Sequence, residues 1–239
     1  MISKMVEYAR HDARAGRFIV RDETSDVKAI EEVYKKNSYQ RKIFKVQPGE
    51  RWLDLGSNIG AFSVFAFSKG CQVVSYEAEP DNAEITRNNI SLNGYAGEVY
   101  HKAIVADSYP SSSIDLYVSS RPMALRRHSV FPHKKDFVKV SVPTIGFSEL
   151  LQKHRDYRCL KMNIEGVEID ILKERPDLSG IDKLVFEWSF DKDKKISTLK
   201  ETLLYLKSQF SYVDMNKKIP NSLTWDFYPP NAFIYAIKI

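Results

Sequence analysis

A carboxylate and two glycines stand close together in Leu53-Asp54-Leu55-Gly56-Ser57-Asn58-Ile59-Gly60, between a short apolar run and Ala61-Phe62-Ser63-Val64. This order predicts a strand, a tight turn and a helix, which is how an α/β sheet builds a nucleotide-sized pocket. The pattern Asp-x-Gly-x-x-x-Gly is not the dinucleotide fingerprint, and Asp54 would repel a pyrophosphate and attract a cation. S-adenosylmethionine, a nucleoside with ammonium and sulfonium groups, fits such a turn. A generic strand-turn-helix is the alternative.

A second acid strengthens the nucleoside interpretation. Glu77 ends the run Cys71-Gln72-Val73-Val74-Ser75-Tyr76, which predicts a second strand. An acid in this position, roughly twenty residues after a glycine turn, can accept hydrogen bonds from both ribose hydroxyls. A solvated acid at a strand end is the simpler alternative, but Asp54 and Glu77 together indicate a site better than either does alone.

A third informative stretch is Cys159-Leu160-Lys161-Met162-Asn163-Ile164-Glu165-Gly166-Val167-Glu168. It predicts a strand, a turn and a helix, with the strand lying beside the first strand across the switch point of the sheet. Asn163 and Glu165, two apart on one strand face, are expected to point into the pocket. Glu168 is expected to be an acid at a helix start, favoured by the helix dipole.

The remaining elements alternate between strands and helices, which predicts a mostly parallel sheet with right-handed crossovers. One strand is expected at Glu98–Val105 and another, or a hairpin arm, at Ser113–Val118. An antiparallel pair is expected near the C-terminus, at 210–214 and 232–237. Residues 1–45 are expected to form a helical cap over the sheet or a dimer arm, because Val27, Ile30 and Val33 have helical spacing. Residues 46–239 would then form the main domain.

A basic segment, Ser119 to Lys135, interrupts this pattern with the side chains Arg121, Arg126, Arg127, His128, His133, Lys134 and Lys135. A long basic loop at the ligand side of a sheet could bind an anionic acceptor, such as a nucleotide-sugar, a phosphorylated glycan or nucleic acid. A solvated connection is the alternative. The histidines lack the companion ligands of a metal site, and we expect no metal.

Composition bounds the class of protein. The chain has 239 residues, of which 43% are hydrophobic, and a net charge of +5 from 36 basic and 31 acidic residues. We expect a cytoplasmic protein without a membrane span, because no apolar run approaches the ~20 residues of a membrane helix. Cys71 and Cys159 are too few for a disulfide scaffold. The mild charge disfavours nucleic acid as the partner without excluding it.

The motifs quoted above, together with Val46-Gln47-Pro48-Gly49-Glu50 and Asn88-Asn89-Ile90-Ser91-Leu92-Asn93-Gly94, resemble those of FkbM-type class I S-adenosylmethionine-dependent methyltransferases over about residues 46–190. The resemblance implies an α/β, Rossmann-like fold: a mostly parallel seven-stranded sheet with one C-terminal antiparallel strand and helices on both faces. It implies a cofactor site that we assign to Asp54, Gly56, Ser57, Asn58, Gly60, Glu77, Ala78, Ala103 and Asn163. Three departures stand out: Asn163 replaces the usual Asp, Ala78 a common proline, and Ile145-Gly146 a Leu-Asp pair.

The resemblance also implies O-methylation, often of sugar hydroxyls on glycans or glycosylated small molecules. We expect Glu165, Glu187 and His128, or His133 in place of His128, to orient the acceptor and take its proton. An RNA ribose methyltransferase is one alternative, supported by the basic segment. A non-catalytic cofactor-binding module is the other, because Asn163 departs from the family pattern. Base N-methylation is disfavoured, because Tyr228-Pro229-Pro230-Asn231 stands in the wrong place for its motif.

Overall fold

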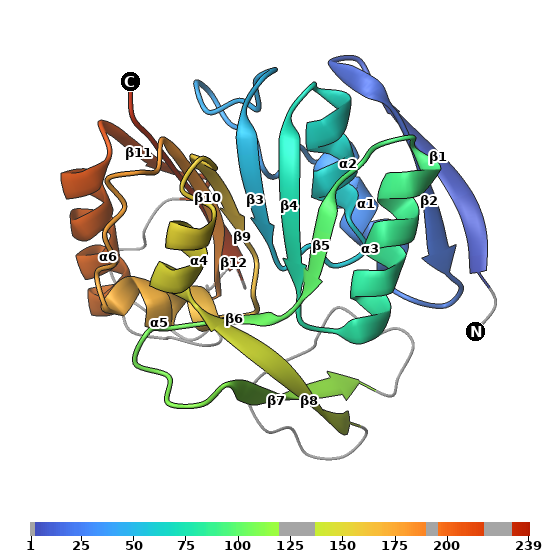
Figure 1. Cartoon of the computed structure of the whole chain (residues 1–239). Coiled ribbons are helices and arrows are strands. Elements are labelled where there is room, and N and C mark those ends of the chain that lie inside the picture. The colour runs from blue at the N-terminus through green and yellow to red at the C-terminus, as the bar shows by residue number, and fades with distance from the viewer. Residues whose placement is uncertain (1–2, 120–136, 190–195, 218–230) are drawn as a thin grey trace.

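The computed structural model describes residues 3–119, 137–189, 196–217 and 231–239 (Figure 1). The strands are β1 Ser3–Arg10, β2 Ala13–Arg21, β3 Arg51–Leu55, β4 Gln72–Glu77, β5 Glu98–His101, β6 Ala103–Val105, β7 Ser113–Ser119, β8 Phe137–Gly146, β9 Cys159–Met162, β10 Lys183–Ser189, β11 Tyr212–Met215 and β12 Asn231–Ile237. The helices are α1 Asp26–Tyr34, α2 Ala61–Ser68, α3 Pro80–Leu92, α4 Phe147–Lys153, α5 Val167–Lys173 and α6 Ile196–Gln209.

A seven-stranded sheet in the order β11-β12-β10-β9-β3-β4-β5 forms the centre of the molecule. Strands β10, β9, β3, β4 and β5 pair in parallel, whereas β12 is antiparallel to both of its neighbours. The mostly parallel sheet, the antiparallel C-terminal pair and the position of β9 beside β3 are therefore confirmed. Strands β4 and β5 lie on one side of β3 and strands β9 and β10 on the other, so the strand order switches between β3 and β9, and a ligand crevice is expected at their carboxyl ends.

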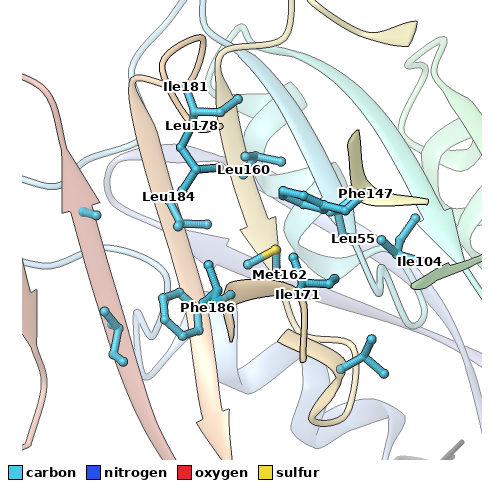
Figure 2. Packing of buried hydrophobic residues seen from close by; sticks show 14 of the residues in the cluster. Leu55, Ile104, Phe147, Leu160, Met162, Ile171, Leu178, Ile181, Leu184 and Phe186 are labelled. Carbon is cyan, nitrogen blue, oxygen red and sulfur yellow. The ribbon is translucent and has the colours of Figure 1, made fainter. Parts of the chain in front are cut away.

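Two hydrophobic cores fill the two faces of this sheet. Alternation along β3 directs Leu53 and Leu55 to one face and Trp52 to the other. Figure 2 shows the first core, where Leu55, Leu160, Met162 and Phe186 lie among side chains of α4 and α5. Helices α4, α5 and α6 cover this face, and α1, α2 and α3 cover the other (Figure 1).

The N-terminal segment differs from the prediction. Residues 3–21 form the antiparallel hairpin β1–β2, so the helical prediction is wrong there, although helix α1 lies at the predicted helical spacing. The sequence of β2 alternates, with Phe18 and Val20 fully buried against α2 and α3. Asn89 of α3 accepts a hydrogen bond from the N–H of Ile19 at 2.7 Å. Tertiary contacts with α3 thus stabilise a hairpin that has no other strand beside it.

A second, smaller sheet lies across one end of the main sheet, in the order β6-β8-β7 (Figure 1). The strand expected at Glu98–Val105 is in fact two strands, because the chain leaves the main sheet at Lys102, whose N–H donates to the carbonyl of Glu77 at 3.1 Å. Strands β7 and β8 form the expected hairpin. Since Glu77 ends β4, the small sheet starts at the carboxyl edge of the large one.

No helix in the described part of the chain combines the length and the apolarity that crossing a membrane requires.

Candidate functional site

In the turn after β3, every second residue has a positive φ. Gly56, Asn58 and Gly60 have φ values of 76°, 53° and 80°, all in the left-handed region. A Cβ atom on Gly56 would lie 1.9 Å from the carbonyl oxygen of Asn163. Two constraints therefore favour glycine over any other residue at Gly56: its positive φ and the close approach of the segment that follows β9.

The N–H groups of this turn are used within the protein. Their acceptors are the Tyr76 carbonyl for Gly56 and Ser57, a Glu77 carboxylate oxygen for Asn58, the Asn58 side chain for Ile59 and the Ser57 carbonyl for Gly60. Helix α2 begins only at Ala61, after these five residues. None of the N–H groups of Gly56 to Gly60 is left to donate to a pyrophosphate, which disfavours the usual mode of dinucleotide binding at this turn.

Asp54 is fully buried below the turn and holds a cation from the protein itself. One carboxylate oxygen lies 2.8 Å from Nζ of Lys161, which is 3% exposed, and the other accepts a hydrogen bond from Ser63 at 2.5 Å. Lys161 also donates to the carbonyl of Gly56 at 2.6 Å. The ion pair thus links β3, β9 and the turn, and a contact of Asp54 with a ligand stays a prediction.

Glu77 lies at the carboxyl end of β4 and is 7% exposed. Its two oxygens accept hydrogen bonds from the N–H groups of Asn58 at 2.6 Å and Glu79 at 2.9 Å. Burial raises the pKa of this carboxyl to about 7, against the lowering effect of these hydrogen bonds. Because each carboxylate oxygen has two lone pairs, both oxygens can still accept a ribose hydroxyl. The residues therefore fit a nucleoside whose charge is positive rather than negative.

Helix α3 supports the turn from outside. The hydroxyl of Thr86 donates to the carbonyl of Asn58 at 2.6 Å and lies 3.2 Å from the Ser57 hydroxyl. Ser57 is therefore part of the internal structure of the turn. Glu79 caps α3, accepting from the N–H groups of Asp81 and Asn82.

Asn163 lies half-buried at the end of β9, where its N–H donates to the carbonyl of Leu55 at 2.9 Å. Its side-chain amide donates to the hydroxyl of Tyr39 at 3.3 Å. Tyr39 comes from the N-terminal segment, is 5% exposed and packs edge-on against Phe62 and Phe233. The segment before β3 thus contributes a side chain to the carboxyl edge of the sheet.

The two glutamates after β9 have different environments. Strand β9 ends at Met162, and Glu165 is an exposed turn residue with φ 60°, so the prediction that Asn163 and Glu165 share a strand face is wrong. Glu168 is 1% exposed in the first turn of α5, as expected, and accepts hydrogen bonds from the N–H groups of Ile164 and Gly166. Burial raises the pKa of Glu168 to about 7.

Glu187 lies half-buried in β10, next to the residue that pairs with the last residue of β9. The side-chain amide of Asn231 donates to it at 2.5 Å. Burial raises the pKa of Tyr39 well above its ordinary value, and the charges of Glu32 and Glu187 add to this effect. Glu187 pairs across the sheet with Phe233, whose ring packs against that of Tyr39, and this places Glu187 on the same side of the sheet edge as Tyr39.

The remaining predicted site residues are two alanines and the residues of the basic segment. Ala78 is half-buried and its carbonyl accepts from the His101 ring at 3.0 Å, and Ala103 is buried in β6. The predictions for the basic loop lie outside the described residues: His128, His133, Arg121, Arg126 and Arg127. Within the described ranges, no group of three or more His, Cys, Asp or Glu side chains could hold a metal ion.

Sequence reasoning missed three residues that shape the site. A lysine inside the apolar run Cys159–Met162 indicates a buried ion pair, so Lys161 could have been found. Thr86 and Tyr39 gave no such indication, because each acts through a contact with a distant part of the chain.

Known proteins show low sequence similarity to this chain. The chain is 27% identical to a tRNA (uracil(54)-C(5))-methyltransferase of Pyrococcus horikoshii over 37% of its own length, but it spans only 24% of that protein. Among solved structures, Methanococcus jannaschii fibrillarin, a pre-rRNA processing protein, matches with a TM-score of 0.49 and 8% identity over 100% of this chain and 90% of that one. A Pyrococcus abyssi tRNA (uracil-54, C5)-methyltransferase in complex with S-adenosyl-L-homocysteine matches with a TM-score of 0.43 and 13% identity over 97% and 43%.

The match to a protein-family model covers more of the chain than the match to the Pyrococcus horikoshii tRNA methyltransferase does. The model of the methyltransferase FkbM domain matches residues 54–213, which is more than half of the chain and includes the glycine turn, Glu77 and β9. The sheet order and the acidic, donor-poor turn agree with a class I methyltransferase. The chain therefore belongs to the FkbM family of methyltransferases, with S-adenosylmethionine as its cofactor.

Proposed function

We propose that the protein transfers a methyl group to a hydroxyl of a saccharide, on a glycan or a glycosylated small molecule. The observation that carries this proposal is the acidity of the edge around β9 and β10, where Glu165, Glu168 and Glu187 lie. The nearby Lys161 is buried in its ion pair with Asp54. Carboxylates accept hydrogen bonds from hydroxyl groups and repel phosphates, so this edge favours an uncharged acceptor.

The donor half of the site binds S-adenosylmethionine. Glu77 accepts hydrogen bonds from the ribose hydroxyls, and the turn Asp54–Gly60 forms the rest of this half. S-adenosylmethionine supplies an electrophilic methyl carbon on a sulfonium. Asp54 acts indirectly, because its partner Lys161 fixes the carbonyl of Gly56. Asn163 lies between the turn and Tyr39, in a position to contact the amino-acid end of the cofactor.

The acceptor half has to align a hydroxyl and receive its proton. With S-adenosylmethionine bound, the cofactor would supply the methyl group to the acceptor oxygen, and a carboxylate of this chain would receive the hydroxyl proton. Glu187 is our first choice for that carboxylate, because it is half-buried, its strand partner Phe233 packs against Tyr39, and Asn231 fixes its orientation. Glu165 is exposed at the turn and is the second choice.

RNA is the second candidate acceptor. The relative that matches 37% of this chain is a tRNA methyltransferase, and the basic segment 119–135 would suit a phosphate backbone. The anionic acceptors that we predicted for Arg121, Arg126 and Arg127 include anionic carbohydrates, a nucleotide-sugar or a phosphorylated glycan, as well as nucleic acid. An RNA acceptor would make methylation strongly dependent on salt, whereas a neutral saccharide would not.

Two measurements test the proposal. Calorimetric titration with S-adenosylmethionine should show binding by the wild type and at least tenfold weaker binding by Glu77→Ala. Glu84→Ala, on an exposed face of α3, is the matched control and should bind normally. Transfer of labelled methyl groups should then be measured with saccharides and RNA at low and high salt. Labelling of RNA alone would reject the saccharide acceptor, and normal binding by Glu77→Ala would reject the donor site.

A further inference from the structure

A cavity of about 670 Å³ lies beside the candidate donor site, between the β6–β7 connection, β7 and α5. None of the predicted cofactor residues lines it. Its walls nevertheless adjoin the donor site at two points, because Val105 ends the strand that Ala103 begins, and Val167 directly follows the turn after β9. Its volume is within the range of ~300–1,000 Å³ that is usual for small-molecule sites.

Hydrogen bonds fix the two sides of this cavity relative to each other. Glu174, after the end of α5, accepts from the N–H of Asp107 at 2.9 Å and from the N–H and hydroxyl of Ser108. Tyr109 is held in the same connection, where its N–H donates to Ala106 and its hydroxyl donates to Ser113. The cavity is therefore a built feature of the fold rather than a gap between independent loops.

The lining combines rings, aliphatic groups and carboxylates. Tyr109, Tyr117 and Pro110 provide flat apolar surface, and Asp115 and Asp170 have side chains that are 45% and 56% exposed. Three carboxylates and one lysine line the cavity, and Lys139 pairs with Asp115 beside it, so this group of side chains keeps a net negative charge. Sugars present apolar C–H faces and rims of hydroxyl donors, which match ring surfaces and carboxylate acceptors. The negative charge repels phosphates and sulfates.

We propose that this cavity binds a saccharide unit of the acceptor, uncharged or bearing an amino group, adjacent to the unit that is methylated. The inference rests on the proposed function for its link to methylation, but the binding itself can be measured without the methyl donor. Asp115 and Asp170 accept hydroxyl hydrogen bonds at the rim, and Tyr117 packs against a sugar face.

Binding should be measured by NMR titration of the full chain with chitotriose, its de-acetylated and therefore cationic form, a sulfated trisaccharide and a short RNA hairpin. We expect the wild type to bind one or both of the first two, and the double variant Tyr117→Leu/Asp170→Asn to bind at least fivefold more weakly. Asp156→Asn, a 73% exposed aspartate outside the cavity, is the matched control and should bind as the wild type does.

Affinity for S-adenosylmethionine shows whether the double variant is folded, and it should not change. Equal saccharide affinity in wild type and double variant, no binding of either uncharged or cationic trisaccharide, or a loss of RNA binding alone would each overturn the inference. Saccharide binding without any saccharide methylation would overturn the proposed function and leave this site standing. Methylation of a saccharide with the same KM in the wild type and the double variant would support the proposed function and overturn this site.

Discussion

The glycine turn and the cavity beside α5 are adjacent in the fold but are built differently. In the turn, backbone N–H groups and buried carboxylates all have partners within the protein. In the cavity, the carboxylates of Asp115 and Asp170 lie at the rim and pair with exposed lysines. Buried polar groups need fixed partners, whereas exposed side chains can exchange water for a ligand. The donor side therefore depends on a backbone geometry that tolerates little change, and the acceptor side on replaceable side chains.

The largest expected effect is the loss of the buried ion pair below the turn. Lys161→Met leaves the carboxylate of Asp54 buried without its cation, which should cost about 3–5 kcal/mol of unfolding free energy. Lys139→Met removes the partner of Asp115 at the rim of the cavity and should cost at most about 1 kcal/mol, because both side chains are exposed. Urea unfolding measures both. Equal losses would contradict the contrast between the two regions.

A second large effect is expected at the close approach of the turn to β9. Gly56→Ala should lower the unfolding free energy by about 2–5 kcal/mol, because strain at φ 76° adds to overlap with the Asn163 carbonyl. Gly49→Ala is the matched control: its φ is 84°, but its Cβ would meet no atom within 4 Å. That variant should lose only the strain, about 1–2 kcal/mol. Thermal unfolding of the pair isolates the contribution of the contact.

An intermediate effect is expected from the protonation of Glu77. Its folded-state pKa of about 7 lies above the ordinary 4.5, so protonation of Glu77 stabilises the fold. The cofactor-free protein should lose this stabilisation as the pH rises from about 4.5 through 7. Cofactor binding should show the opposite trend, because the ionised carboxylate is the better acceptor and attracts the cationic ligand. Affinity should fall by up to about tenfold for each pH unit below 7.

The Glu77→Gln variant provides the comparison for both trends. It should remove most of the pH dependence of cofactor affinity between pH 6 and 8, as measured by calorimetry. The difference in unfolding temperature between this variant and the wild type isolates Glu77 from Glu168, whose pKa is also raised to about 7. A wild-type affinity that does not change with pH would contradict the assignment of Glu77 to the ribose.

The smallest effect is expected where the N-terminal segment reaches the site. Tyr39→Phe keeps the buried ring and removes the hydroxyl that accepts a hydrogen bond from Asn163. The loss of about 0.5–1.5 kcal/mol should appear as roughly twofold to tenfold weaker cofactor binding, with a small change in stability. Tyr205→Phe removes a hydrogen bond to the carbonyl of Pro176, away from the carboxyl edge, and should leave cofactor affinity unchanged.

The parts of the fold that the sequence predicted correctly are those with local patterns. The strand that leads into the glycine turn and the strand that ends at Glu77 each carry their own apolar pattern and breaking residues. The N-terminal hairpin was missed because its alternation is clear only at Phe18 and Val20, and because Asn89, seventy residues away, binds its backbone. The position of Glu165 was missed because β9 ends after four residues, before the alternation assumed for it.

The sequence by itself determined the glycine turn, the strands that end at Leu55 and Glu77 and the acid at the end of β4, because turn residues and alternating apolar residues act within a few positions of each other. Only the tertiary structure decided that Asp54 faces Lys161 and that Tyr39 reaches Asn163. It also decided that the chain leaves the main sheet at Lys102 to form a cavity beside α5. These features depend on contacts between distant segments, which local patterns do not encode.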